Sequence, residues 1–189
     1  EAVEWWQAEL ARLGVDVRLG VEATAEAVFA EAPDAVIVAT GSRYSPGGRC
    51  VERDADLPGW DQPHVFRPED ILLRGARPQG QVVLLDGEGH HASTGIAEIL
   101  AKSGAEVTYV TAGYSPVSSQ LMDSFEEKFV VQRLKAAGVR FAPSGWARVI
   151  GKDSVTLYDT HTGEERSVSA NAVVLATGRE PVDGLARAL

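Results

Sequence analysis

The chain has 189 residues, of which 44% are hydrophobic and 24% are charged, and its formal net charge at pH 7 is -9. These values are typical of a globular protein with a sizeable core, and the negative charge argues against nucleic-acid and anionic-membrane partners, because phosphate binding depends on clustered Lys and Arg. The lone Cys50 excludes an internal disulfide framework and a Cys-rich metal site, and no apolar run reaches the roughly 18 residues of a membrane span. We expect no signal peptide and a cytoplasmic location.

The first forty residues predict two helices and two strands. Residues 1–13 carry apolar side chains at helical spacing, and residues 15–19 alternate between apolar and polar as a half-solvated strand does. Thr24 is a candidate cap for a helix over 24–32, and the apolar run at 34–41 predicts a buried strand that ends in a glycine turn. Because the chain opens directly into a helix rather than on Met, we expect it to be part of a longer protein.

Residues 34–41 and 171–178 form an internal repeat. The two octets are identical at five positions, and each ends in Ala-Thr-Gly. The pattern predicts two related strands that bracket the middle of the chain. We therefore expect parts of two related nucleotide-binding halves, one of which lacks its beginning.

The middle of the chain, residues 81–111, predicts a strand, a turn, a helix and a second strand. A continuous apolar run at 82–85 is typical of a parallel strand buried on both faces. The following helix ends at Gly104, and residues 106–110 supply the next strand. This order is the right-handed crossover unit of nucleotide-binding sheets.

The turn of this unit has two interpretations. Gly87, Gly89 and Ala92 formally fill the glycine pattern with which a helix N-terminus approaches a pyrophosphate, which indicates an NAD(P) site. Asp86 and Glu88, however, place carboxylates where the pyrophosphate would lie, and like charges repel at close range. The second strand also ends without an acidic residue for a ribose hydroxyl. The alternatives are a working NAD(P) site and a retained fold whose site has been lost, and the charges favour the second.

The remainder of the chain predicts connecting and antiparallel structure. We expect connecting chain over 42–80 with a short helix at 68–72, and a further helix over 124–137. Short strands are predicted at 139–142, 148–150, 154–158 and 166–168, with a hairpin turn at 162–163. The four His residues lack metal-ligand spacing with a carboxylate or thiol, so we expect no metal site.

The two Ala-Thr-Gly strand ends and the Thr-Gly-Arg-Glu-Pro run at 177–181 resemble the flavoprotein disulfide-reductase superfamily, in which a nucleotide domain is inserted into an FAD-type domain. The chain is more closely similar to the trimethylamine dehydrogenase group, which includes histamine dehydrogenase and 2,4-dienoyl-CoA reductase. These are NADH:flavin oxidoreductase-type proteins that join an old yellow enzyme-like flavin barrel to such a pair of domains. The resemblance is carried, in order, by residues 36–42, Cys50, 57–59, 68–70, 82–86 and 97–108.

The resemblance implies a Rossmann-like FAD/NAD(P)-binding α/β fold, in which a parallel sheet, its flanking helices and a small antiparallel β layer form three layers. It further implies a remnant of the FAD/ADP-type domain over 1–48, a connecting segment over 49–79, an inserted NAD(P)-binding-like domain over 80–178 and a return toward the first domain over 179–189. The turn at 86–91 looks like the longer, non-glycine version found in the amine dehydrogenases.

The implied parent enzyme is a homodimer that holds covalent FMN and a 4Fe-4S cluster in its barrel. It passes electrons to an electron-transferring flavoprotein. An ADP or FAD site would retain half of its residues here, at Thr40, Gly41 and Ala23, and Gly87 and Gly89 are the candidates in the inserted domain. We expect no catalytic or metal-binding residue in this chain and no cofactor in the isolated chain.

The leading hypothesis is a nucleotide-fold module of an iron-sulfur flavoprotein that acts as scaffold and electron-acceptor docking surface. One alternative is an NAD(P)H-binding module that feeds electrons to FAD in a dienoyl-CoA-reductase-like parent. The other is a purely structural domain that binds nothing and packs against the barrel.

Overall fold

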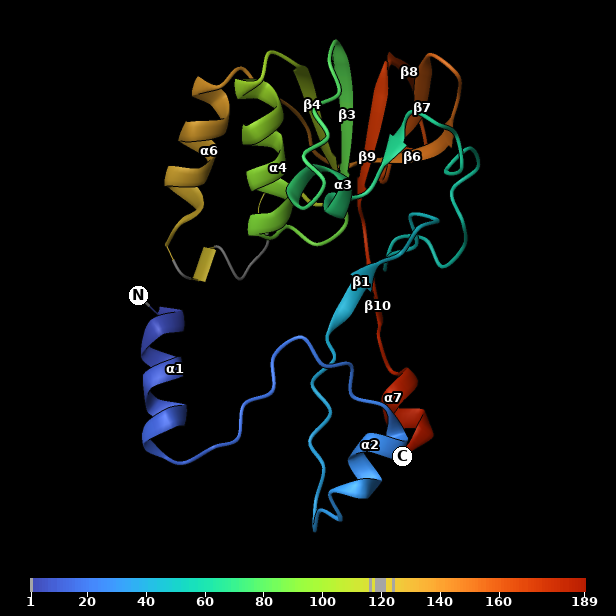
Figure 1. The fold of residues 1–189 in the computed structure, drawn as a ribbon. Helices are drawn as coiled ribbons and strands as arrows, with labels where there is room; N and C mark the ends of the chain where they lie inside the picture. Colours follow the sequence, from blue (N-terminus) through green and yellow to red (C-terminus); the bar gives the residue numbers. More distant parts are fainter. Residues whose placement is uncertain (1, 116, 118–121, 124) are drawn as a thin grey trace. The chain divides into compact units, whose positions relative to one another are not determined.

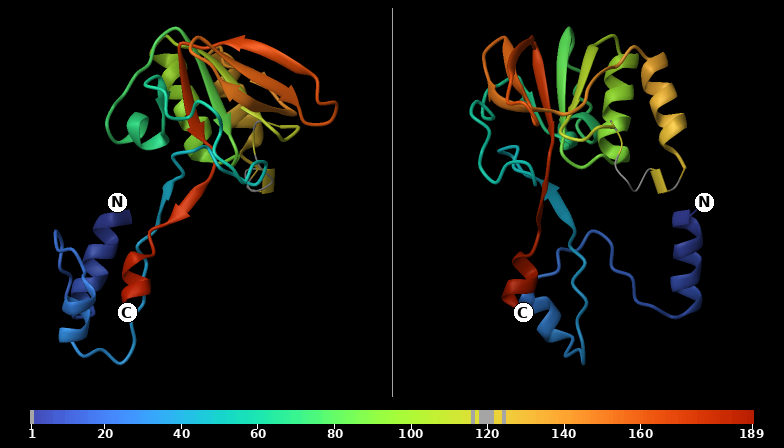
Figure 2. Two further views of the ribbon diagram at one scale, coloured as in Figure 1. Left: turned by 90° about the vertical axis from the view of Figure 1, so that its right-hand side faces the viewer. Right: turned by 180° about the vertical axis from the view of Figure 1, so that it is seen from behind.

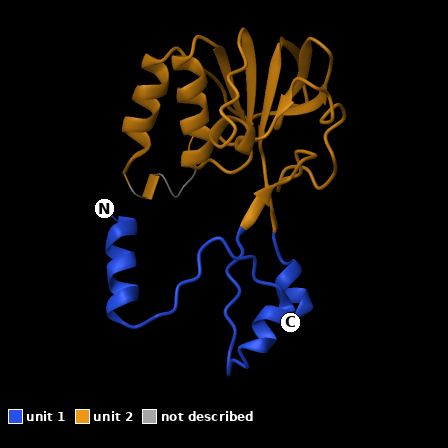
Figure 3. Cartoon of the chain, in the orientation of Figure 1, with its two compact units in different colours: residues 1–41, 182–189 blue, residues 42–181 orange. Residues whose placement is uncertain are grey.

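A computed structural model describes residues 2–115, 117, 122–123 and 125–189, and the chain divides into two compact units. Unit 1 consists of residues 1–41 and 182–189, and unit 2 of residues 42–181 (Figure 3). The expected domain boundaries at residues 48 and 79 both fall within unit 2. None of the described helices is long and apolar enough to cross a membrane.

The described residues of unit 1 form three helices, α1 (Ala2–Arg12), α2 (Ala25–Ala30) and α7 (Gly184–Ala188). The hydroxyl of Thr24 accepts a hydrogen bond from the backbone N–H of Ala27 at 3.2 Å, so Thr24 is the N-cap of α2 as expected.

The two strands predicted in unit 1 are wrong for this structure. Residues 15–19 and 34–41 have no strand pairing, and Ile37 is 94% exposed. A strand needs a neighbour for its backbone N–H and C=O groups, and none of the described residues supplies one here. The matching octet at the other end of the chain does form a strand, because it lies between two partners.

Unit 2 is built on a five-stranded parallel sheet with the order β2-β9-β3-β4-β5 (Figure 1). Its strands are β2 (Val65–Phe66), β9 (Ala172–Ala176), β3 (Gln81–Asp86), β4 (Glu106–Thr111) and β5 (Arg140–Ala142). The chain runs from β3 outward through β4 to β5 and then returns to the other side of β3 as β9. The carboxyl ends of β3 and β9 therefore form the switch point of the sheet, where open α/β sheets bind ligands.

Helices cover one face of this sheet and a second sheet covers the other. The helices are α3 (Pro68–Leu72), α4 (His91–Lys102) and α6 (Glu127–Ala136), and the antiparallel sheet consists of β6 (Gly145–Ile150), β7 (Ser154–Asp159) and β8 (Glu165–Ser169). Figures 1 and 2 show these layers. The α/β fold with three layers is thus confirmed. The start predicted for α6 at Ser124 lies outside the described residues.

The side chains of β3 alternate between the two cores, as the two-residue period of a strand requires. Val82 and Leu84 lie in the core beneath the helices, with Ile96 and Leu100 of α4. Val83 and Leu85 lie in the second core, which includes Trp146 of β6 and Leu157 of β7. Because all four β3 side chains are at most 1% exposed, the central strand is fixed from both sides and its end is held in place.

A short antiparallel ribbon carries the chain into and out of unit 2. It consists of β1 (Ser42–Tyr44) and β10 (Arg179–Pro181), each of which directly follows one of the Ala-Thr-Gly repeats. The residue pairs are Ser42 with Pro181, Arg43 with Glu180 and Tyr44 with Arg179. The sequence did not predict this ribbon, because neither strand is long enough to show a two-residue period.

Candidate functional site

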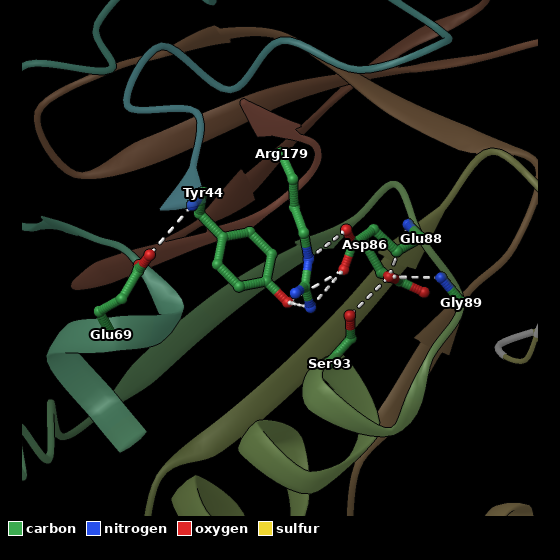
Figure 4. A network of polar contacts seen from close by, with 7 residues as sticks. All are labelled: Tyr44, Glu69, Asp86, Glu88, Gly89, Ser93 and Arg179. Carbon is green, nitrogen blue, oxygen red and sulfur yellow. Dashed lines mark hydrogen bonds and ion pairs between the residues drawn. The ribbon is translucent and has the colours of Figure 1, made fainter. Parts of the chain in front are cut away.

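The turn between β3 and α4 is organised by the side chain of Asp86, the last residue of β3. Its Oδ1 atom accepts hydrogen bonds from the backbone N–H groups of Glu88 at 3.1 Å and Gly89 at 2.8 Å, and from the hydroxyl of Ser93 at 2.7 Å (Figure 4). Its Oδ2 atom accepts a hydrogen bond from the hydroxyl of Tyr109 in β4 at 2.6 Å. The carboxylate therefore has partners from the turn, the helix and the neighbouring strand.

Asp86 is only 1% exposed, and this burial raises the pKa of its carboxyl group. The hydrogen bonds from Tyr109, Ser93 and the two backbone N–H groups act in the opposite direction but do not cancel the effect of burial. Burial, and then the adjacent Asp86, also raise the pKa of Tyr109. The pair thus forms a buried polar centre directly beneath the turn.

The same hydrogen bonds bear on whether the glycine pattern of this turn can bind a pyrophosphate. A pyrophosphate at a helix N-terminus is held by backbone N–H groups of the preceding turn. Here the N–H groups of Glu88 and Gly89 already donate to Asp86, an anion within the chain itself. A pyrophosphate at this turn would therefore meet both the repulsion of the carboxylates and the loss of these two donors.

The fold itself requires glycine at both glycine positions of the turn. Gly89 has φ +68°, a backbone conformation that strains other residues. Gly87 lies so close to the chain at the end of β9 that a Cβ atom on it would be 2.3 Å from the carbonyl oxygen of Thr177 and 3.1 Å from the Cβ atom of Cys50. Gly87 and Gly89 are therefore required by the fold, and a role in cofactor binding stays a prediction.

Arg179, which lies near the end of unit 2 in the sequence, contacts the turn. Its Nε atom donates to Oε1 of Glu88 at 2.8 Å, and its NH2 group donates to the hydroxyl of Tyr44 at 2.8 Å. The Tyr44 hydroxyl in turn donates to Oε2 of Glu88 at 3.0 Å, and the guanidinium carbon lies 4.5 Å from the centre of the Tyr44 ring. Figure 4 shows the three side chains in contact. Burial, and then the charge of Glu88, raise the pKa of Tyr44 to about 12, although Arg179 opposes this.

Two cavities lie on either side of the turn, and both are lined by Gly87 and Glu88. The smaller, about 160 Å³, extends along the ends of β3 and β4 and is also lined by Glu52. The larger, about 490 Å³, lies at the switch point between β3 and β9. Its walls include the buried hydroxyls of Ser45 and Thr177, and neither has a hydrogen-bond partner among the described residues. Ser45 and Thr177 thus place two hydroxyls, each unpaired within the described part of the chain and with almost no exposed surface, in the wall of the larger cavity.

Unit 1 holds the other predicted site residues. Ala23 and Thr40 line one cavity of about 470 Å³, together with the apolar side chains of Val182 and Leu185. The Thr40 hydroxyl donates to the backbone carbonyl of Val182, and Gly41, with φ +73°, follows directly. The described lining contains no Lys or Arg. The cavity thus suits an apolar ring of adenine size better than the phosphates attached to it.

Sequence reasoning did not identify Tyr44, Ser93, Tyr109 or Arg179 as parts of the turn. Ser93 and Tyr109 belong to elements that were predicted correctly, but a hydrogen bond between them and Asp86 leaves no pattern in a single sequence. Arg179 carried one usable signal, because it directly follows the second Ala-Thr-Gly and so lies at the end of a predicted strand. That this strand lies beside β3 is known only from the structure. Among the described residues, no three His, Cys, Asp or Glu side chains are grouped to hold a metal.

This parallel sheet, its helices and its antiparallel layer define a Rossmann-like nucleotide-binding fold. The chain belongs to the pyridine nucleotide-disulphide oxidoreductase family, whose model matches residues 21–189. The family is one of oxidoreductases that bind nucleotide cofactors through this fold, so the chain is an oxidoreductase nucleotide-binding module.

Individual relatives place the chain more narrowly. It is 32% identical over 189 residues to an NADH oxidase of Thermoanaerobacter brockii, a match that covers 95% of this chain and 26% of the relative. The 6-hydroxypseudooxynicotine amine oxidase of Pseudomonas geniculata N1 has a TM-score of 0.85 and 34% identity, over 92% of this chain and 26% of that one. Histamine dehydrogenase of Rhizobium sp. 4-9 has a TM-score of 0.89 and 25% identity, over 99% of this chain and 29% of that one. The resemblance to the amine dehydrogenase group is thereby confirmed.

The chain spans about a quarter of the length of the curated relative and of these solved structures. The similarity therefore describes one part of each of these larger proteins.

Proposed function

We propose that this chain is the nucleotide-fold module of a multidomain iron-sulfur flavoprotein oxidoreductase that resembles trimethylamine dehydrogenase, and that its turn after β3 does not bind a nicotinamide nucleotide. The observation that carries this proposal is the pair of hydrogen bonds from the N–H groups of Glu88 and Gly89 to Asp86. The module then acts as a scaffold and as a docking surface for the electron acceptor in a cytoplasmic enzyme.

Calorimetric titration of the 189-residue chain with NADH and NADPH tests this proposal. We expect no heat of binding at micromolar to low millimolar concentrations, because the turn would have to give up its contacts with Asp86 before it could hold a pyrophosphate. Binding of either nucleotide with a micromolar dissociation constant would overturn the proposal.

The second candidate function is an NAD(P)H-binding module that delivers electrons to a flavin. The relative named NADH oxidase favours it, as does the larger cavity beside Gly87 and Glu88, which lies at the switch point. If this candidate is correct, the titration gives saturable binding, and Gly89→Val abolishes it by straining the turn. The matched substitution Gly163→Val strains a hairpin turn with φ +75° in the β7–β8 hairpin and would leave binding unchanged.

We further propose that an ADP or FAD group in the parent enzyme uses Ala23, Thr40 and Gly41 for its adenosine end. The apolar lining of the unit 1 cavity supports this, and the absence of a cation among the described lining residues requires that other parts of the parent hold the phosphates. Denaturation of the purified parent and chromatography of the released nucleotides provide the test. Recovery of neither ADP nor FAD would favour the purely structural alternative.

We assign the FMN and the 4Fe-4S cluster of the proposed parent to its flavin barrel, because Cys50 is the only cysteine in this chain. Electron-transferring flavoprotein is the proposed acceptor, and the parent is proposed to be a homodimer. Chemical cross-linking of the parent to its electron-transferring flavoprotein, followed by mass spectrometry, would map the docking surface. Cross-links confined to the barrel would contradict a docking role for this module.

A further inference from the structure

The β1–β10 ribbon is too short to be stable through its own pairing. It has three residue pairs, whereas an isolated two-stranded hairpin is at best marginally stable in water. The exposed ion pair between Arg43 and Glu180, at 3.8 Å, adds little, because solvent screens such pairs. The ribbon therefore depends on contacts with the rest of unit 2.

The ribbon makes several polar contacts with the turn after β3. Tyr44 and Arg179 face each other as a cross-strand pair, and both bind the carboxylate of Glu88, whose side chain is 14% exposed. Tyr44 itself is 6% exposed, so its hydroxyl is largely removed from water. Charge-assisted hydrogen bonds in such partly buried positions are stronger than neutral ones.

Glu88, the residue of the turn that makes this contact, is itself held in place. The carboxylate of Glu88 holds the ribbon, while the backbone N–H of the same residue donates to Asp86. Glu88 also lines both cavities beside the turn. A movement of the turn that displaces Glu88 must therefore break the contact with Tyr44 and Arg179.

We propose that Tyr44, Glu88 and Arg179 form a latch that couples the conformation of the β3–α4 turn to the β1–β10 ribbon. The ribbon is ordered while Glu88 holds it, and it loosens when the turn moves. Since the ribbon carries the chain into and out of unit 2, the latch connects the switch point of the sheet to the ends of this unit. This coupling would exist whether or not a nucleotide binds at the turn.

Backbone hydrogen exchange of the full 189-residue chain, measured by NMR, tests the latch in both directions. On the ribbon side, the N–H of Tyr44 donates to Glu69 at 3.0 Å and the N–H of Ser45 donates to Gly178 at 2.9 Å. On the turn side, the N–H groups of Glu88 and Gly89 donate to Asp86. These four hydrogen-bonded amides report the opening of the two segments separately.

We expect Glu88→Gln, a change in the turn, to accelerate exchange at the ribbon amides by about tenfold. Because a coupling free energy is reciprocal, Arg179→Gln, a change in the ribbon, should accelerate exchange at the turn amides by about the same factor. The double variant should exchange no faster than either single variant. Faster exchange confined to the segment that carries the substitution would overturn the proposal.

A matched control is available on the antiparallel sheet. Arg148 pairs with Glu165 at 3.0 Å and lies 4.4 Å from the centre of the Tyr158 ring, an arrangement similar to that of Arg179. Arg148→Gln should leave all four amides unchanged. If Arg179→Gln does not fold, Tyr44→Phe replaces it, because this variant keeps the ring and removes the hydroxyl. We then expect faster exchange at the amides of Glu88 and Gly89. Unchanged exchange at these amides would count against the latch.

Discussion

The hydroxyl of Tyr109 lies 2.6 Å from Oδ2 of Asp86 in the interior of unit 2, where both residues are at most 1% exposed. Burial of an ionisable side chain is costly unless its hydrogen bonds are satisfied. Asp86 is satisfied by four donors, the backbone N–H groups of Glu88 and Gly89 and the hydroxyls of Ser93 and Tyr109. Four groups from three structural elements thus depend on one side chain.

Asp86→Ala is therefore expected to lower the free energy of unfolding by about 3 kcal/mol or more, because buried donors without acceptors cost about 1–3 kcal/mol each. Asp86→Asn, which retains one acceptor oxygen, should cost less than half as much. Urea denaturation followed by circular dichroism measures both.

The control is Asp159→Ala, in the solvent-accessible β7–β8 turn, where the carboxylate accepts hydrogen bonds from the backbone N–H groups of His161 and Thr162. Water can replace those bonds, so a loss below about 1 kcal/mol is expected. Equal losses at the two aspartates would show that Asp86 is not the centre of a buried network.

The raised pKa of Asp86 predicts a pH dependence of stability with a definite sign. A carboxyl group with a higher pKa in the folded state binds its proton more tightly there, so its contribution to stability is complete below its ordinary value near 3.8. That contribution is lost as the pH rises through the folded-state pKa. The free energy of unfolding of the wild type should therefore fall, relative to that of Asp86→Asn, as the pH rises above about 4. A difference between the two proteins that is constant with pH would contradict the assignment.

The latch predicts an unusual tyrosine titration. Tyr44, with a pKa of about 12, should remain protonated after ordinary tyrosines have ionised, and it should contribute stability below about pH 10 that is lost as the pH rises through about 12. Absorbance of tyrosinate should show this late step in the wild type and not in Tyr44→Phe. In Glu88→Gln the step should move to lower pH, since the charge of Glu88 helps to raise the pKa. Circular dichroism at each pH confirms that the chain is folded.

Gly87 should resist substitution for steric reasons. Gly87→Ala brings a methyl group against the carbonyl oxygen of Thr177, a backbone atom that cannot move aside, and should cost about 2 kcal/mol or more. Gly95, within α4, has no atom within 4 Å of the position of an added Cβ. Gly95→Ala should therefore stabilise the protein by about 0.5–1 kcal/mol, since Ala is the better helix former. Thermal unfolding of the two variants compares them directly, and similar melting temperatures would exclude the close packing around Gly87.

The sequence predicted those parts of unit 2 whose side chains repeat at a regular spacing. The run at 82–85, the helix that ends before Gly104 and the hairpin at 162–163 were all correct because periodicity and turn chemistry are local properties. The run at 34–41 is identical at five of eight positions to the octet that contains β9, yet it forms no strand. Apolar sequence alone does not make a strand without a neighbour.

The candidate site was only partly predictable. Asp86 and Glu88 were recognised as unusual at a glycine turn, but the partners that explain them come from distant positions. Arg179 lies 91 residues from Glu88 in the sequence. Which cation meets which carboxylate is decided by the order of the strands in the sheet, and a single sequence does not specify that order.

The pairing of Ser42 with Pro181 has a consequence for how such proteins arise. Because the first and last residues of unit 2 are neighbours, the whole unit can be removed from its host or transferred to another with little disturbance at the junction. A gene segment that encodes residues 42–181 would behave as a transferable domain. Its binding site could be changed or lost in evolution while the two points at which it joins the surrounding protein stayed the same.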